Sequence, residues 1–211
     1  MAGVTLEMAC AATYARFKRK SGSFSCQLVF AKTKIVPEGM SIPRAELMAA
    51  SLNASTGHAV NHALSDMIKG RMHFTDSQIA LCWISNSRLR LKQWPRNQVI
   101  EVERLTKKEN WVNIDGKNMM PDIGTRKGAK ISDILENSPW FGGFPWTKTG
   151  KDRFPIKRFQ DIRSSNEDRK RHDEEELMRL DVSDPEWING QFFWILSCTQ
   201  PRGTRQNPSE I

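Results

Sequence analysis

The alternation of apolar and polar positions predicts a β-hairpin near the beginning of the chain. Residues 9–17 and 24–35 are rich in small apolar, aromatic and β-branched side chains, and the polar segment 18–23 (KRKSGS) separates them. Two such runs joined by a short polar turn are typical of paired antiparallel strands. We therefore expect a strand over each of the two apolar ranges.

A long helix is expected after the hairpin. Apolar side chains recur every three or four residues from Pro43 to about Met67, and Pro43 suits the first turn of a helix. The pattern then predicts a strand at 72–76, a helix at 77–84, a helix at about 95–107, a strand at 111–114 and a helix beginning within 121–126. This order of elements is typical of a mixed α/β layer structure.

The regular pattern stops after Gly150. Residues 163–176 form a mixed-charge run, residues 201–211 are polar, and only residues 187–196 are apolar. We therefore expect two parts: a domain at 1–146 and a charged tail at 147–211, largely irregular with at most one short helix.

The net charge of +8 belongs to the first two-thirds of the chain of 211 residues. Residues 1–146 carry 20 Lys and Arg against 12 Asp and Glu, whereas residues 147–211 carry 12 of each kind. A basic excess suits a polyanionic partner such as nucleic acid. It equally suits a soluble surface that happens to be basic, so composition alone leaves both interpretations open.

Other features exclude several classes of protein. No apolar run approaches the roughly 20 residues that a membrane span needs, and Glu7 interrupts the region where a signal peptide would be apolar. We expect an intracellular protein, cytoplasmic or nuclear, with no membrane partner. The isolated cysteines argue against a zinc site or a disulfide framework and are expected to be reduced and mostly buried: Cys10, Cys26, Cys82 and Cys198.

Three acidic residues stand out by their positions in the predicted elements. Glu46 lies in the first turn of the long helix, Asp76 ends a short strand, and Asp122 begins the last helix. Carboxylates that meet at one edge of a sheet are the ligands that Mg²⁺ requires. Each also has a purely structural explanation: a favourable helix dipole for Glu46, an N-cap for Asp76 and an exposed first-turn acid for Asp122.

Four basic residues are candidates for phosphate contacts. Arg88, Arg90 and Lys92 alternate with leucines ahead of Trp94, and Arg44 lies beside Glu46. Such side chains neutralise phosphates without reading sequence. A solvated helix or loop face is the alternative for all four.

Several segments, taken in order, resemble the ribonuclease H-like region of BEL/Pao retrotransposon polyproteins. Residues 31–50 read AKTKIVPEGMSIPRAELMAA, similar to the lysine-bearing strand, proline turn and IPRLELMAA of that family, and residues 74–77 (FTDS) are similar to its WTDS. The likeness continues through CWI at 82–84, RNQVIE at 96–101, residues 111–126, SPWFGG at 138–143 and PW at 145–146. It covers about residues 3–146.

This resemblance implies a ribonuclease H-like fold, a five-stranded mixed sheet flanked by helices. It also implies hydrolysis of the RNA strand of an RNA–DNA hybrid by two Mg²⁺ ions, or Mn²⁺ in their place, held by four acidic residues. Three of these positions carry over to Glu46, Asp76 and Asp122. The first two would hold the ions and orient the attacking water, and Asp122 would support the metal near that water. The implied partners are an RNA–DNA hybrid or other nucleic acid and the remainder of a retrotransposon polyprotein.

The chain also departs from the family pattern. The family's first acid lies in a DAS motif that falls on Gly3-Val4-Thr5 here, and the strand that should carry it is missing. The family's histidine falls on Asn113, its DNPAD falls on residues 118–122 (NMMPD), and no cysteine/histidine zinc module is recognisable in residues 147–211. We therefore expect an N-terminally truncated, gapped sheet and a fragment or decayed copy whose hydrolytic activity is weakened or lost.

Two other functions remain open. A non-catalytic module would keep the basic face and bind nucleic acid without cutting it. A protein-interaction module would use the aromatic cluster of Trp140, Phe141, Phe144 and Trp146. The favoured interpretation of that cluster is a closing segment that packs on its own sheet.

Overall fold

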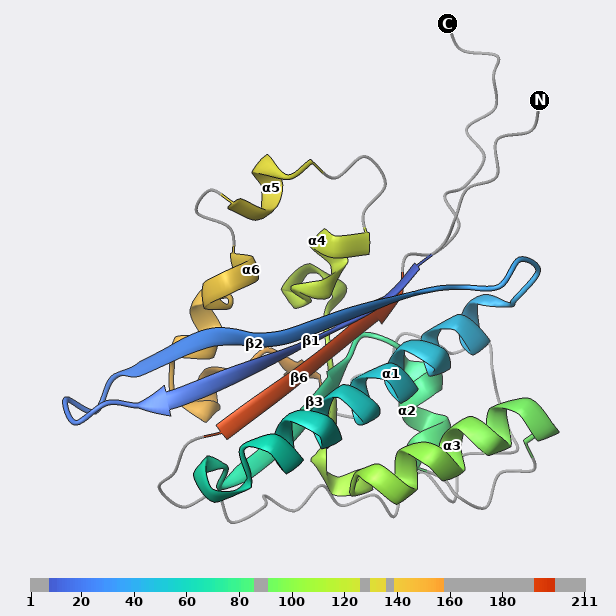
Figure 1. Ribbon diagram of the computed structural model, residues 1–211, viewed down its shortest axis with the longest axis horizontal. Helices are drawn as coiled ribbons and strands as arrows, with labels where there is room; N and C mark the ends of the chain where they lie inside the picture. Colours follow the sequence, from blue (N-terminus) through green and yellow to red (C-terminus); the bar gives the residue numbers. More distant parts are fainter. Residues whose placement is uncertain (1–7, 86–90, 126–129, 136–138, 158–191, 200–211) are drawn as a thin grey trace, which may run out of the picture.

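The computed structural model describes residues 8–85, 91–125, 130–135, 139–157 and 192–199. Its strands form one six-stranded sheet in the order β2-β1-β6-β3-β4-β5 (Figure 1). The strands are β1 (Met8–Lys18), β2 (Phe24–Ile35), β3 (Gly70–Thr75), β4 (Trp111–Ile114), β5 (Ile156–Lys157) and β6 (Phe192–Thr199). Strands β6, β3 and β4 run parallel to one another, whereas β2, β1 and β6 are paired antiparallel, as are β4 and β5.

Helices follow β2, β3 and β4, as the sequence pattern predicts. The α-helices are α1 (Ile42–Ala63), α2 (Gln78–Ser85), α3 (Gln93–Leu105), α4 (Pro121–Thr125), α5 (Ser132–Leu135) and α6 (Pro139–Gly142). Short 3₁₀ turns are η1 (Ser65–Met67), η2 (Lys108–Asn110), η3 (Gly116–Asn118), η4 (Pro145–Lys148) and η5 (Lys151–Arg153). The mixed α/β class is therefore confirmed. No helix within the described ranges combines the length and the apolar character that a bilayer-spanning segment requires.

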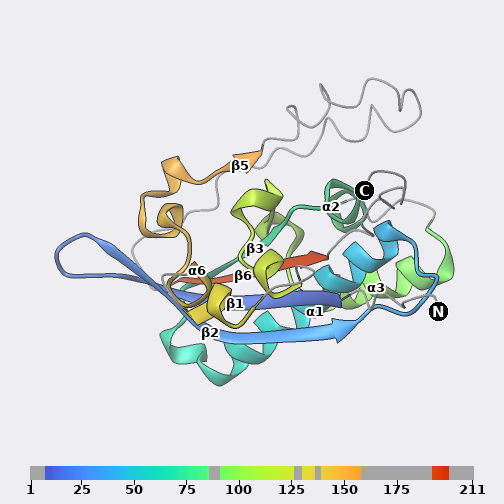
Figure 2. The same ribbon diagram turned by 90° about the horizontal axis from the view of Figure 1, so that it is seen from above.

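The expectation of a gapped sheet is wrong. Strand β6 lies between β1 and β3, the position that the resemblance implies for the first strand of the family (Figure 2). It runs antiparallel to β1 from Ala9↔Thr199 to Arg16↔Phe192 and parallel to β3 from Gly70↔Phe192 to Thr75↔Ser197. Because a segment from the far end of the chain occupies this position, the sheet is continuous.

The division predicted at residue 146 stays a prediction, and two described strands lie beyond it. Strands β5 and β6 both come from the expected tail and pair with strands of the expected domain. Residues 158–191 and 200–211, which make up most of that tail, lie outside the described residues.

Both faces of the sheet are covered, so its central strands are buried on both sides. Residues 9–16 of β1 are all buried, although they alternate between the two faces. Helices α1, α2 and α3 pack against one face, and α4 and α6 lie on the other (Figure 1). This explains why β1 reads as a nearly continuous run of small apolar residues rather than as an alternating strand.

Aromatic residues of the closing segment complete the second face. Phe144 and Trp146 are partly buried and pack against the core cluster that contains Phe74 and Phe154, with the Trp146 ring 5.6 Å from the Phe74 ring. The hydroxyl of Tyr14 on β1 donates a hydrogen bond to the carbonyl of Trp140 at 2.7 Å. The segment therefore packs on its own sheet, and of the four aromatic residues only Phe141 is clearly exposed.

Under the first face, a buried polar group joins α1 to β3 and β4. The Nδ1 of His73 donates a hydrogen bond to Oδ1 of Asn53 at 2.7 Å, and Nδ2 of Asn53 donates to the carbonyl of Phe74 at 3.3 Å. The His73 ring stacks on Trp111 with centroids 4.8 Å apart. Burial, with the nearby Arg71 cation, lowers the pKa of His73 to about 3, so the ring is neutral at physiological pH.

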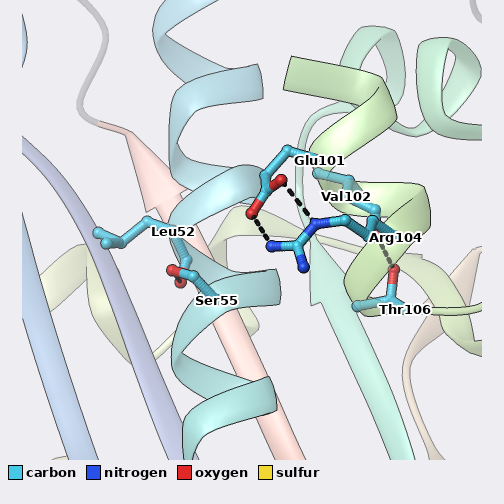
Figure 3. Close-up of polar contacts among 6 residues, drawn as sticks. All are labelled: Leu52, Ser55, Glu101, Val102, Arg104 and Thr106. Atoms are coloured by element: carbon cyan, nitrogen blue, oxygen red, sulfur yellow. Dashed lines mark hydrogen bonds and ion pairs between the residues drawn. The ribbon is translucent and has the colours of Figure 1, made fainter. Parts of the chain in front are cut away.

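The outer surfaces of α1 and α3 carry weaker polar contacts. The Ser55 hydroxyl donates only to the carbonyl of Leu52 in its own helix, and Arg104 forms an exposed ion pair with Glu101 at 2.7 Å (Figure 3). Exposed pairs of this kind contribute little to stability. The contact between α1 and the sheet therefore depends more on Asn53 than on these surface groups.

We predict that Asn53→Ala lowers the free energy of unfolding by about 1–3 kcal/mol, because the change removes the acceptor of the buried Nδ1–H of His73. Urea unfolding of the full chain measures the effect. Ser55→Ala on the same helix is the matched control and should change stability by less than about 0.5 kcal/mol. Equal losses in the two variants would contradict the role assigned to Asn53.

Candidate active site

Glu46 and Ser77 connect the long helix to the end of the central strand β3. Glu46 is the fifth residue of α1, one residue beyond the first turn in which the sequence placed it, and it is half-buried. The Ser77 hydroxyl donates to Oε2 of Glu46 at 2.5 Å and accepts a hydrogen bond from the backbone N–H of Ala80 at 3.0 Å. Ser77 therefore caps α2 and fixes the Glu46 carboxylate at the same time. Burial raises the pKa of Glu46, and the Ser77 hydrogen bond partly opposes this shift.

Asp76 lies immediately after β3, between the two elements that Ser77 joins. Burial raises the pKa of its carboxyl group from 3.8 to about 7, and the negative charges of Glu46 and Asp122 add to the shift. A carboxylate that is destabilised by burial and by two like charges is typical of sites that bind cations or transfer protons. Ionisation of Asp76 is thus opposed both by burial and by the charges of the other two candidate residues.

Asp122 reaches the same region from the opposite face of the sheet. It is half-buried in α4, and the fully buried Met119 and Met120 immediately precede this helix. The helix contacts β1 and β6, so the three acidic residues come from three elements grouped around the same strands. The influence of Asp122 on the pKa of Asp76 indicates that their charges lie near each other.

The turn after β4 passes close to Asp76. A methyl group on Gly116 would lie 3.3 Å from Oδ2 of Asp76, closer than an ordinary van der Waals contact. Beside it, Asp115 forms an ion pair with Lys157 of β5. Glycine at this position therefore avoids a close contact between a side chain and the Asp76 carboxylate. The ion pair connects the same turn to β5.

The three carboxylates match a hard divalent cation in chemical type and in charge. Within the part of the chain that the structure describes, however, no three Asp, Glu, His or Cys side chains lie close enough together to hold an ion. Cation binding would therefore require these side chains to turn toward one another. The Mg²⁺ or Mn²⁺ site at Glu46, Asp76 and Asp122 stays a prediction.

The basic candidates are not gathered into one patch by the residues that can be placed. Arg44 is half-buried, with its guanidinium 5.9 Å from the centre of the Trp94 ring, beside a cleft of about 220 Å³ at the start of α1. Lys92 is exposed at the N-cap of α3. Arg88 and Arg90 lie outside the described residues, as does Gly3, so their predicted roles stay predictions.

Two features of the site were not foreseen from the sequence. Ser77 was considered only as the first residue of a helix, yet its hydroxyl holds Glu46. The neighbour of Asp76 across the sheet is β6: its Ser197 pairs with Thr75, and Cys198 is the next residue along. The apolar run near the end of the chain was the available signal for a strand, but nothing in it specified this pairing.

Asn113, at the position of the family's histidine, is buried and donates to the carbonyl of Thr75 at 3.0 Å.

The protein belongs to the mixed α/β class, and the acidic residue Asp76 follows the carboxyl end of its central parallel strand β3. Residues 5–77 match the family model described as the Pao retrotransposon-like RNaseH-like domain. The resemblance to the BEL/Pao ribonuclease H-like region is therefore confirmed for this segment, which contains Glu46 and Asp76. No curated protein matches the chain.

We predict that Asp76→Asn raises the melting temperature more at pH 8 than at pH 5. The folded pKa of about 7 lies above the ordinary 3.8, so the native state binds more protons than the unfolded state between these values. The free energy of unfolding of the wild-type chain therefore falls as pH rises through this window, and the fall is complete above pH 7. Asparagine removes this charge.

Thermal unfolding of the full chain at the two pH values measures this difference. Glu109→Gln, which removes an exposed carboxylate in η2, is the control and should shift the melting temperature by the same small amount at both pH values. A gain for Asp76→Asn that does not depend on pH would argue against a raised pKa.

Proposed function

We propose that this chain is a retrotransposon-derived ribonuclease H-like domain that binds RNA–DNA hybrids and hydrolyses their RNA strand weakly, with divalent metal ions. The main support is Asp76, a carboxyl group at the end of β3 whose pKa is raised by burial and by two neighbouring carboxylates. This residue lies in the segment that matches the family model. Without a cation the cluster is electrostatically unfavourable, and a bound cation would remove that cost.

Each residue of the site has a proposed role. Glu46 and Asp76 would hold the metal ions, and Asp122 would complete the oxygen ligands from the other face of the sheet. When bound, a pair of Mg²⁺ ions supplies stabilisation of the attacking and leaving oxygens of the phosphodiester. Ser77 restricts the rotation of Glu46 through its hydrogen bond, and the lack of a side chain on Gly116 avoids a close contact with the Asp76 carboxylate.

The activity is proposed to be weak because the cluster supplies three carboxylates. The resemblance implies a fourth, on the strand that neighbours Asp76. In this chain β6 occupies that position, and its residues after Ser197 are Cys198 and Thr199. Neither is an acid, so two doubly charged ions would be held by fewer negative charges than the family pattern provides.

Non-catalytic binding of nucleic acid is the second candidate function. It is favoured by Cys198 and Thr199, neither of them acidic, on the strand where the resemblance implies a fourth carboxylate. The positive charge of residues 1–146 supports binding in either case. A protein-interaction role for the aromatic cluster has less support, because Phe144 and Trp146 are engaged in the core.

We predict that the wild-type chain binds a labelled RNA–DNA hybrid with an affinity that falls as salt rises, and that any cleavage depends on Mg²⁺. Asp76→Asn should abolish cleavage and leave binding within about threefold, because it removes a metal ligand but no phosphate contact. Gel-based cleavage and fluorescence anisotropy measure the two properties. Binding without cleavage at any metal concentration would favour the non-catalytic module, and no hybrid binding would contradict both functions.

We also predict that Cys198→Asp increases Mg²⁺-dependent cleavage by at least about tenfold, because loss of one preorganised group commonly costs on the order of a hundredfold. Cys198→Asn, of the same shape without the charge, is the matched control and should give no gain. Thermal unfolding with and without Mg²⁺ provides a second measurement: the ion should stabilise the aspartate variant more than the wild type. If neither property changes, the register position of Cys198 beside Asp76 does not contribute to the site.

A further inference from the structure

The last strand of the chain occupies the centre of the sheet. All residues of β6 from Phe192 to Thr199 pair with β1, and those from Phe192 to Ser197 pair with β3 as well. Without β6 the described strands would separate into a β1–β2 hairpin and a β3–β4–β5 sheet, each with an unpaired edge. The space between β1 and β3, which we call the strand seat, therefore offers an extended peptide hydrogen-bonding groups on both sides.

The strand seat is also the point at which the acidic site is assembled. Strand β6 contacts α1, which carries Glu46, and α4, which carries Asp122, and it pairs with β3, which Asp76 follows. Of the described strands that pair with β3, β6 is the one that packs extensively against both of these helices. A strand in this position therefore sets the distances between the three acidic elements.

The connection between β5 and β6 is long enough for residues 192–199 to reach the strand seat of the same chain. Residues 158–191 separate β5 from β6 along the chain. A chain of 34 residues can span at most about 110 Å, whereas crossing from β5 over β4 and β3 to β6 requires roughly 15 Å of strand spacings. Tethering at this length gives the segment an effective concentration far above that of a second copy.

We propose that the strand seat is a peptide-binding site whose ligand is the chain's own segment 192–199, bound as a separable unit. The segment remains bound when its covalent connection is cut, and it brings α1, β3 and α4 into register. This holds whether or not the acidic site has catalytic activity, so it does not depend on the proposed function.

Two native cysteines provide a test of the register in the full chain. Cys10 and Cys198 are paired across β1 and β6, and opposed residues of antiparallel strands have Cα separations of about 4.5–5.5 Å, within the range that a disulfide bridges. During refolding with glutathione disulfide, the two thiols lose two protons and two electrons and the glutathione disulfide is reduced to two thiols. Peptide mapping should then identify a Cys10–Cys198 link within one chain.

The matched control shifts the cysteine by one residue. In the double variant Cys198→Ser/Thr199→Cys, the new thiol is opposed to Ala9 instead of Cys10, so the yield of the link should fall at least about tenfold, since the disulfide geometry is no longer met. Equal yields in the two proteins would overturn the register. A link found only between isotopically light and heavy copies, when the two are refolded together, would overturn the assignment of the chain's own segment as ligand.

A second experiment tests separability. A specific protease site inserted between residues 174 and 175 is cut after the full chain has folded, and size-exclusion chromatography in native buffer follows the two fragments. We expect them to elute together. Addition of an excess of a labelled peptide with the sequence of residues 190–201 should then replace the cut segment over time. Immediate loss of the C-terminal fragment, or a labelled peptide that never binds, would overturn the proposal.

Leu196→Pro provides the sequence-specific control for the cut chain. Leu196 pairs with Ala12 on one side and Phe74 on the other, and proline removes a ladder hydrogen bond and is rarely tolerated in a central strand. The fragment that carries this change should dissociate, whereas Thr204→Pro, placed after β6, should have no effect. If the Leu196→Pro chain does not fold before cutting, the comparison is made with two labelled peptides of residues 190–201, one unchanged and one carrying Leu196→Pro. Equal replacement of the cut segment by the two peptides would overturn the proposal.

Discussion

A strand at the centre of a sheet must find hydrogen-bond partners along both of its edges, and most of this structure depends on how that requirement is met. Strand β1 has β2 on one side, supplied by the hairpin, and β3 has β4 on the other. The inner edges of β1 and β3 can pair only through a strand between them. Because the residues of β1 and β3 along these edges are buried, unpaired backbone groups there would cost more than most side-chain contacts contribute. Strand β6 meets the requirement from the far end of the chain.

The acidic cluster has the opposite energetic character. Burial and mutual repulsion make Asp76 hard to ionise, and the pKa of Glu46 is raised as well. The buried contacts of Asn53, His73 and Trp111 hold α1 against β3 and β4 only a few residues away. We interpret the two features together: a stable polar connection under the sheet supports a cluster of charges at its end that is unfavourable by itself. Sites that bind cations commonly have this arrangement.

Local patterns in the sequence were sufficient for most of the elements. The predicted ranges of β2 and β4 match the structure, and those of α1, α2 and α3 differ at their ends by a few residues, as expected when helix ends are read from periodicity alone. Glu46, Asp76 and Asp122 could be proposed as site residues because their positions follow from the ends of strands and helices. The place of β6 could not be found in this way, because the pairing of residues 192–199 with β1 and β3 depends on partners more than a hundred residues away. The same distance explains why the apolar end of the chain was assigned to a tail.

The position of β6 also affects how this chain folds during its synthesis. The ribosome releases a protein from its first residue to its last, and domains usually begin to fold while the rest is still being made. Here the β1–β2 hairpin and the strands β3 and β4 emerge early, but the sheet cannot close until residue 199 has been translated. Until then the two edges that belong in the interior remain exposed, and exposed edges favour aggregation. A product that stops short of residue 192 would therefore have a sheet without its central strand.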